Sequence, residues 1–224
     1  MLSTCSILAI FKSIPAMRHI ALVLLLIITL VSQAQQKIKV ACIGNSITEG
    51  TSIDSVQRYP AQLQRLLGDG YEVKNFGISG RTLLKKGDHP YWQEEKYQIA
   101  LAWQPDIVII KLGTNDSKPQ NWIYADEFET DFKDLIHSFK DLPGKHRIFL
   151  CTPIPVFRES WGISARIVEE EIVPLIEKIA RAERVGLIDL YRAIRQKPEL
   201  APDGVHPNAD GAGVIAQEIF KIVR

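Results

Sequence analysis

The chain has 224 residues, of which 46% are hydrophobic, with 27 basic and 26 acidic side chains. This length suffices for one domain, and the composition is that of a globular protein, which excludes a disordered or collagen-like chain. The formal net charge of +1 lacks the basic excess that binding to nucleic acid requires, so we expect no nucleic-acid partner.

The N-terminus has the pattern of a secretory signal peptide. A short basic stretch at residues 17–19 precedes an apolar run over residues 20–31, and small residues follow at Ser32 and Ala34, as signal peptidase requires. The apolar run is shorter than the roughly 20 residues of a membrane span. We therefore predict a signal peptide over residues 1–34, a mature domain over 35–224 and export to the periplasm or the medium, without stable membrane insertion. The alternative is a buried N-terminal helix or a membrane anchor, and either Met1 or Met17 fits as the start.

Cleavage at this point would remove two basic side chains and no acidic one, so the net charge of the mature chain would be −1. Two cysteines would remain, Cys42 and Cys151, each in or at the end of an apolar run. We interpret both as small buried hydrophobic side chains, although export permits disulfides.

Apolar runs typical of strands alternate with helical periodicity along the mature chain. The predicted strands cover residues 38–43, 71–76, 106–112, 147–152 and 185–190. The predicted helices cover residues 59–67, 94–103, 126–139, 164–182 and 210–223, and Pro174 should kink or split the fourth. The runs Ile107–Ile110 and Ile148–Leu150 are continuous and not alternating, which suits strands of a parallel sheet covered on both faces. We therefore expect a three-layer α/β domain with right-handed crossovers, whose ligand binds beyond the carboxyl ends of the strands.

Ser46 follows the first predicted strand, in Gly44-Asn45-Ser46-Ile47-Thr48. A strand that turns into a helix here would expose this hydroxyl at the sheet edge, beside free backbone N–H groups. Such a serine becomes a nucleophile only when a base removes its proton. The alternative interpretation is a serine that merely caps a helix.

His206 is the candidate base, in Asp203-Gly204-Val205-His206-Pro207 after the fifth predicted strand. One turn can bring the carboxylate of Asp203 to the imidazole, where it would fix the tautomer and stabilise the imidazolium. The alternative is an exposed turn with an incidental histidine.

Two further residues follow predicted strands. Asn115, in Gly113-Thr114-Asn115-Asp116, offers a side-chain amide that could donate to an oxyanion. Gly80, after the second strand, would let a backbone N–H approach a ligand closely. Each residue alone fits an ordinary loop as well.

Taken together, these four blocks resemble the SGNH (GDSL-type) hydrolase family. The matching runs are Gly44-Asn45-Ser46, Ile78-Ser79-Gly80, Gly113-Thr114-Asn115-Asp116 and Asp203-Gly204-Val205-His206. The resemblance implies a flavodoxin-like sheet of five parallel strands in the order 2-1-3-4-5. This order would keep Cys42 on strand one from neighbouring Cys151 on strand four, which argues against a disulfide. It also implies catalytic roles for Ser46, Asp203 and His206, and an oxyanion hole formed by the N–H groups of Ser46 and Gly80 and the amide of Asn115. Asn45 departs from the aspartate that the family often has there, and we expect retained activity.

The substrate is predicted less sharply. Trp92, Trp122 and Trp161 follow strands two, three and four, where they could bind sugar rings or acyl chains, and Arg81 could bind a carboxylate. The stretch from Lys118 to Trp122 resembles exported bacterial sialate or carbohydrate O-acetylesterases of the family. We therefore predict a serine esterase that hydrolyses small O-acyl esters, most simply O-acetyl esters, on carbohydrates and needs no metal or cofactor.

Three alternatives stay open. A lysophospholipase or thioesterase of the same family would prefer long acyl chains. The sequence shows no long apolar lid, which argues against a triglyceride lipase. A non-catalytic glycan-binding protein would not react with fluorophosphonate at Ser46. A metal-dependent phosphoesterase would lose activity in chelator, but the sequence lacks the usual metal-ligand spacings. The natural glycan and the oligomeric state are not predicted.

Overall fold

A computed structural model describes residues 36–224, so the predicted signal peptide of residues 1–34 lies outside the described residues. The strands are β1 (Ile38–Gly44), β2 (Tyr71–Gly77), β3 (Ile107–Lys111), β4 (Arg147–Cys151) and β5 (Gly186–Ile188). The helices are α3 (Ser46–Glu49), α4 (Tyr59–Leu67), α5 (Glu95–Trp103), α6 (Pro119–Trp122), α7 (Phe128–Lys140), α8 (Ala165–Ile167), α9 (Val173–Glu183), α10 (Leu190–Ile194) and α11 (Ala209–Val223). Short 3₁₀ turns are η2 (Ser55–Gln57), η3 (Tyr91–Gln93), η4 (Asn115–Ser117), η5 (Ala125–Glu127) and η7 (Pro198–Leu200), and η6 (Val168–Ile172) is a π-helical segment.

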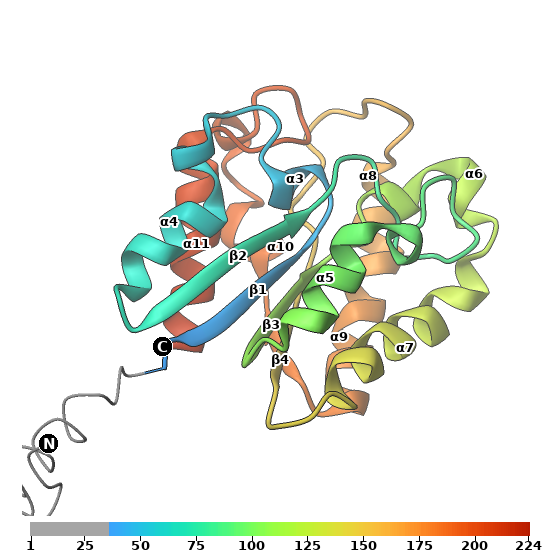
Figure 1. The fold of residues 1–224 in the computed structure, drawn as a ribbon. Helices are drawn as coiled ribbons and strands as arrows, with labels where there is room; N and C mark the ends of the chain where they lie inside the picture. The colour runs from blue at the N-terminus through green and yellow to red at the C-terminus, as the bar shows by residue number, and fades with distance from the viewer. Residues whose placement is uncertain (1–35) are drawn as a thin grey trace, which may run out of the picture. The chain divides into compact units, whose positions relative to one another are not determined.

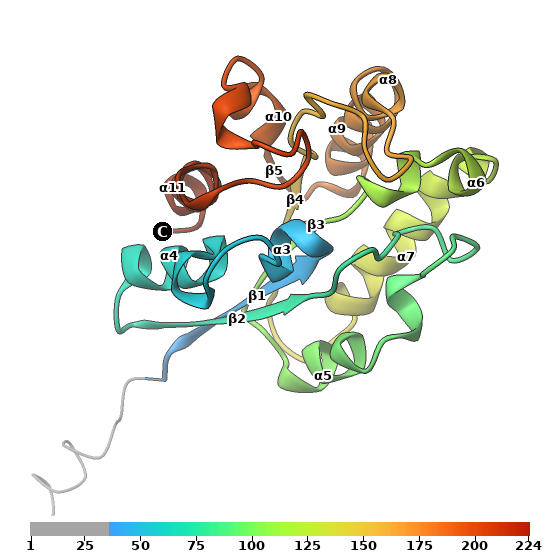
Figure 2. The same ribbon diagram turned by 90° about the horizontal axis from the view of Figure 1, so that it is seen from above.

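The five strands form one parallel sheet in the order β2-β1-β3-β4-β5, which confirms the predicted topology (Figures 1 and 2). Every residue of β3 is buried, as the continuous apolar run Ile107–Ile110 predicts for a central strand covered on both faces. After β1, the chain adds β2 on one side of this strand and β3, β4 and β5 on the other. Folds of this kind bind ligands beyond the carboxyl ends of the two strands where the direction changes, here β1 and β3.

Helices cover both faces of the sheet (Figures 1 and 2). Helices α5, α7 and α9 pack on one face, where alternate strand residues such as Ile43 and Ile110 meet the apolar side of α7. Helices α4, α10 and α11 cover the other face, where Cys42 and Ile109 contribute to the second core. The layers therefore match the predicted three-layer arrangement.

The fourth predicted helix is continuous from Ala165 to Glu183, because α8, η6 and α9 follow one another without a gap. Pro174 therefore does not split it and lies in the first turn of α9, directly after the π-helical segment η6. A π-helical segment changes the local hydrogen-bond pattern of a helix, which accommodates a proline that lacks the N–H. Cys42 and Cys151 are buried free thiols, as predicted, because β3 separates the strands that carry them.

The short helix α3 packs closely against the end of β2. Asn75 donates from its side-chain amide to the carbonyl oxygen of Thr48 at 2.8 Å. Gly77 faces the backbone of the same helix, because a Cβ built on Gly77 would lie 2.3 Å from the nitrogen of Glu49. Only a residue without a side chain therefore allows α3, which begins with Ser46, to approach the sheet this closely.

Replacement of Gly77 by alanine should destabilise the fold, since the added methyl meets backbone atoms that cannot rotate away. We expect a loss of about 1–3 kcal/mol in the free energy of unfolding, measured by urea denaturation. Gly70→Ala is the matched control, because a Cβ at Gly70 would meet nothing within 4 Å. Equal stability of the two variants would contradict the close approach.

Candidate active site

Ser46 is the first residue of α3, directly after β1. Asn45 caps this helix: its side-chain oxygen accepts a hydrogen bond from the backbone N–H of Ile47 at 3.1 Å. Gly50, with φ of 73°, ends the helix after one turn. The carboxylate of Glu49 accepts the N–H of Ser79 at 2.7 Å and thus ties α3 to the segment that carries Gly80. These contacts fix Ser46 at the carboxyl edge of the sheet, where it is 7% exposed.

The imidazole of His206 lies between the hydroxyl of Ser46 and the carboxylate of Asp203. Its Nε2 is 2.9 Å from Ser46 Oγ, and its Nδ1 is 2.8 Å from Asp203 Oδ2. With the proton on Nδ1 donated to the carboxylate, Nε2 is free to accept the proton of the serine hydroxyl. The structure thus brings together three residues that are separated by up to 160 positions in the sequence.

The second oxygen of the Asp203 carboxylate holds the backbone of its own loop. Asp203 Oδ1 accepts the N–H groups of Val205 at 2.8 Å and of His206 at 2.6 Å. Partial burial acts to raise the pKa of this carboxyl, but these N–H groups and the imidazole of His206 outweigh it, so the pKa is lowered. The carboxylate therefore stays charged at neutral pH, as an acceptor for the imidazole must.

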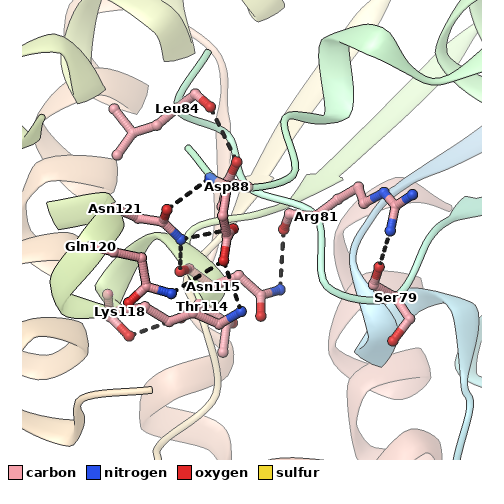
Figure 3. A network of polar contacts seen from close by, with 11 residues as sticks. Ser79, Arg81, Leu84, Asp88, Thr114, Asn115, Lys118, Gln120 and Asn121 are labelled. Carbon is pink, nitrogen blue, oxygen red and sulfur yellow. Dashed lines mark hydrogen bonds and ion pairs between the residues drawn. The ribbon is translucent and has the colours of Figure 1, made fainter. Parts of the chain in front are cut away.

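Asn115 opens η4 after β3 and is 5% exposed. Its side-chain amide donates one hydrogen bond to the carbonyl oxygen of Arg81 at 3.1 Å, which fixes the orientation of the amide (Figure 3). An amide nitrogen has two hydrogens, so the second can serve an oxygen atom in the cavity. Gly80, which precedes Arg81, has φ of 79°. This left-handed conformation favours glycine, because a Cβ would be strained there.

The segment after Gly80 is anchored to the region around Asn115 by buried polar contacts. The carboxylate of Asp116 accepts the N–H groups of Leu83 at 3.1 Å and of Leu84 at 2.8 Å. Burial raises the pKa of Asp116 to about 6, although these N–H groups act in the opposite direction. The two segments that would supply oxyanion donors are therefore held against each other by a carboxylate next to Asn115.

Figure 3 shows a second connection between the same segments. The side-chain amide of Asn121 donates to the carbonyl oxygen of Asn115 at 2.9 Å and to the carboxylate of Asp88 at 3.0 Å, and its oxygen accepts the N–H of Asp88. Gln120 donates to the same carboxylate at 3.2 Å, and Lys118 lies 3.5 Å from it. Burial acts to raise the pKa of Asp88, but these donors outweigh it and the pKa is lowered.

A cavity of about 200 Å³ opens beside Ser46. Its lining residues are Ser46, Ser79, Gly80, Asn115, Lys118, Trp161, Ile163 and His206. The serine, the imidazole and both predicted neighbours, Gly80 and Asn115, therefore face one space. This arrangement offers a nucleophile with its base, and N–H donors for a developing negative charge.

The predicted substrate-binding residues lie in different places. Trp161 lines the cavity. The indole of Trp92 donates to the carbonyl oxygen of Leu83, and that of Trp122 donates to the carboxylate of Glu171; both indoles pack against the core. The guanidinium of Arg81 pairs with Glu94 at 2.6 Å. Of these four residues, only Trp161 lines the cavity beside Ser46.

Sequence reasoning did not assign Lys118 and Ile163 to the site, although both line the cavity. Lys118 lies three residues after Asn115, so its proximity could have been inferred from the Asn115 block. Ile163 has no comparable signal, since it reaches the cavity through the conformation of a long loop after β4. Within residues 36–224, no cluster of three or more His, Cys, Asp or Glu side chains is arranged to hold a metal ion.

Comparison with known proteins identifies a family and relatives for this chain. The sequence model of the GDSL-like lipase/acylhydrolase family matches residues 42–214. An acetylxylan esterase from Xylanibacter ruminicola is 44% identical over an alignment of 210 residues, which covers 85% of this chain and 44% of that relative. The chain therefore spans less than half the length of this relative.

Solved structures share the fold. A carbohydrate acetylesterase from Sinorhizobium meliloti superposes with a TM-score of 0.68 at 22% identity, over 84% of this chain and 98% of that one. An acetylxylan esterase from Geobacillus stearothermophilus has a TM-score of 0.64 at 25% identity, over 83% and 95% of the two chains.

Proposed function

We propose that this chain, which belongs to the GDSL-like lipase/acylhydrolase family, is a serine esterase that removes acetyl groups from the hydroxyls of a carbohydrate. The observation that carries the proposal is the continuous line of hydrogen bonds from Ser46 through His206 to Asp203, with distances of 2.9 and 2.8 Å. The relatives named acetylxylan esterase and carbohydrate acetylesterase support the choice of an acetylated sugar, and acetylated xylan in particular.

In the proposed mechanism, Ser46 Oγ attacks the carbonyl carbon of the acetyl ester while His206 Nε2 takes the hydroxyl proton. The carbonyl oxygen becomes an oxyanion that accepts hydrogen bonds from the N–H groups of Ser46 and Gly80 and from the amide of Asn115. His206 then returns the proton to the sugar oxygen, the bond from that oxygen to the carbonyl carbon breaks, and an acetyl-serine remains. Water, deprotonated by His206, then attacks the acetyl-serine. His206 returns the proton to Ser46 Oγ as the bond from Oγ to the carbonyl carbon breaks, and acetate leaves.

Two features of the site fit a small acyl group on a polar alcohol. The cavity of about 200 Å³ is small, and polar groups make up much of its lining, including the Ser79, Asn115 and Lys118 side chains. The test is acetate release from acetylated xylan fragments, acetylated pectin fragments and acetylated sialic acids, with Ser46→Ala as the control. A preference for nitrophenyl esters of eight carbons or more over nitrophenyl acetate would contradict the proposal and favour a lysophospholipase or thioesterase.

Asn115→Ala should lower kcat about 10²- to 10³-fold, because loss of one oxyanion donor removes a contact that is strongest in the transition state. KM for nitrophenyl acetate should change little. Asn121→Ala is the comparison, since Asn121 holds the carbonyl oxygen of Asn115 but does not line the cavity. A smaller effect of Asn115→Ala than of Asn121→Ala on kcat would contradict the assigned role.

Export belongs to the same proposal and depends on the signal pattern of residues 1–34. In the described part of the chain, residues 36–224, no helix has the length and apolarity needed to cross a membrane. N-terminal sequencing of the protein recovered from outside the cytoplasm tests the cleavage site, which we expect after Ala34.

A further inference from the structure

Trp161 has an unusual backbone conformation at the edge of the cavity. Trp161 and Gly162 both have positive φ, at 54° and 76°, and the N–H of Ile163 donates to the carbonyl oxygen of Ser160 at 3.0 Å. Two left-handed central residues closed by this bond define a type I′ turn, whose first central position favours Asn, Asp or Gly. A bulky side chain is disfavoured there, because its Cβ crowds the backbone.

Burial of the indole does not compensate for this strain. Trp161 is 59% exposed, and among the large hydrophobic residues of 36–224 only Ile123 at 72% and Val56 at 63% are more exposed. Its one ring–ring contact within residues 36–224 is with His206, at 5.0 Å between centroids and with an interplanar angle of 62°. Most of the indole surface therefore faces solvent and the cavity that it lines.

The surrounding structure holds the turn in place. The N–H of Phe157 donates to the carbonyl oxygen of Gly204 at 2.8 Å, which joins the loop to the segment that carries Asp203 and His206. On the other side, the N–H of Ser164 donates to Ser117 Oγ at 3.1 Å, which joins the loop to the η4 turn that begins with Asn115. A strained conformation that is fixed from both sides next to a reactive group points to a functional use of the side chain.

We propose that the indole of Trp161 is the platform for the sugar ring whose acetyl group enters the cavity beside Ser46. The inference rests on the proposed function and names the part of the substrate that is bound: a pyranose ring, whose C–H face packs on the exposed indole while the ester carbonyl reaches Ser46. A flat apolar surface beside polar groups suits a molecule that has both C–H and O–H faces.

Trp161→Asn separates this role from a structural one, because asparagine is favoured in the left-handed conformation that tryptophan resists. The free energy of unfolding should stay the same or rise. The value of kcat/KM for acetylated xylo-oligosaccharides should fall about tenfold, mainly through KM, since a platform binds ground state and transition state alike. For vinyl acetate, which has no ring, kcat/KM should change less than about threefold.

Trp161→Phe should have an intermediate effect on the oligosaccharide. Val56→Asn is the matched control, because it replaces another exposed apolar residue, outside the cavity, by the same side chain. An equal loss with vinyl acetate and oligosaccharide would show that the indole acts through His206, and unchanged activity with both substrates would show no role. Either result overturns the platform.

A binding measurement distinguishes failure of the platform from failure of the proposed function. In the Ser46→Ala background, titration calorimetry with xylohexaose should detect binding that Trp161→Asn weakens about tenfold. If the enzyme hydrolyses vinyl acetate but no acetylated saccharide, the proposed function is wrong, and the titration still tests whether Trp161 binds a sugar ring. Absence of xylohexaose binding, or binding that does not depend on Trp161, would overturn the proposed role of Trp161.

Discussion

Ser46→Ala should reduce kcat for nitrophenyl acetate about a million-fold, the size of effect expected when the nucleophile of a serine hydrolase is removed. The acyl-enzyme cannot form without Oγ, and the imidazole of His206 then faces a methyl group. A residual rate of about 10³- to 10⁴-fold over water should remain, because the N–H donors and the bound geometry are unchanged. Steady-state kinetics measures the fall in kcat, and labelling with a fluorophosphonate measures the loss of the reactive hydroxyl.

The variant should fold normally. Asn45, and not Ser46, supplies the cap of α3, and alanine is a good helix former at the first helical position. Ser79→Ala is the matched control: Ser79 lines the same cavity, but within residues 36–224 its hydroxyl makes no hydrogen bond to His206. Fluorophosphonate labelling should persist in Ser79→Ala and vanish in Ser46→Ala. Labelling that survives in Ser46→Ala would refute the assignment of the nucleophile.

Much of this site could be predicted because parallel strands deliver their carboxyl ends to one edge of the sheet. The buried run before Ser46 and the buried run before Asn115 form β1 and β3, which are hydrogen-bonded neighbours, so the two residues that follow them had to lie close together. Asp203 and His206 needed only one turn to meet. These parts of the prediction depend on hydrophobic pattern and short spacing, which the sequence displays directly.

The remaining parts depend on contacts between distant residues that have no periodic signal. The segment after Gly80 is positioned by Asp116, whose carboxylate binds N–H groups 32 and 33 residues away. The fifth predicted strand extends to residue 190, whereas β5 ends at Ile188, because the side chain of Asp189 caps α10 through the N–H of Arg192. Local propensity favours a strand there, and the capping interaction overrides it.

The left-handed backbone of Trp161 is a third feature that the sequence does not display. Gly162 indicates a turn, but a type I′ turn is expected to begin with Asn, Asp or Gly, so nothing predicted a positive φ for the tryptophan. Departures of this kind concentrate at functional positions, where other contacts hold the chain in a conformation that its own preference opposes.

Asp203→Asn should lower kcat about 10⁴-fold while it preserves the structure of the loop. Asparagine keeps an oxygen for the N–H groups of Val205 and His206, which Asp203 Oδ1 accepts at 2.8 and 2.6 Å. Its amide nitrogen then replaces Oδ2, at the position 2.8 Å from Nδ1 of His206. Two donors cannot share that contact, so the imidazole proton moves to Nε2, which then donates to Ser46 instead of accepting its proton.

Asp189→Asn provides the matched comparison, because Asp189 also binds a backbone N–H through its carboxylate but does not contact an imidazole. Its kcat for nitrophenyl acetate should stay within about twofold of wild type. Equal kcat values for the two variants would contradict the role of Asp203.

The stability of Asp203→Asn should depend on pH in a defined direction. The lowered pKa means that the carboxylate stabilises the native state above the pKa of the unfolded chain, and this contribution disappears as the pH falls through the native pKa. Wild type should therefore be more stable than Asp203→Asn at pH 7, and urea denaturation at pH 3 should show a smaller difference, because a protonated Asp203 resembles asparagine. If this difference in the free energy of unfolding increased toward acidic pH, the native fold would have to prefer the neutral carboxyl of Asp203. That result would contradict the role of Asp203 as the charged partner of His206.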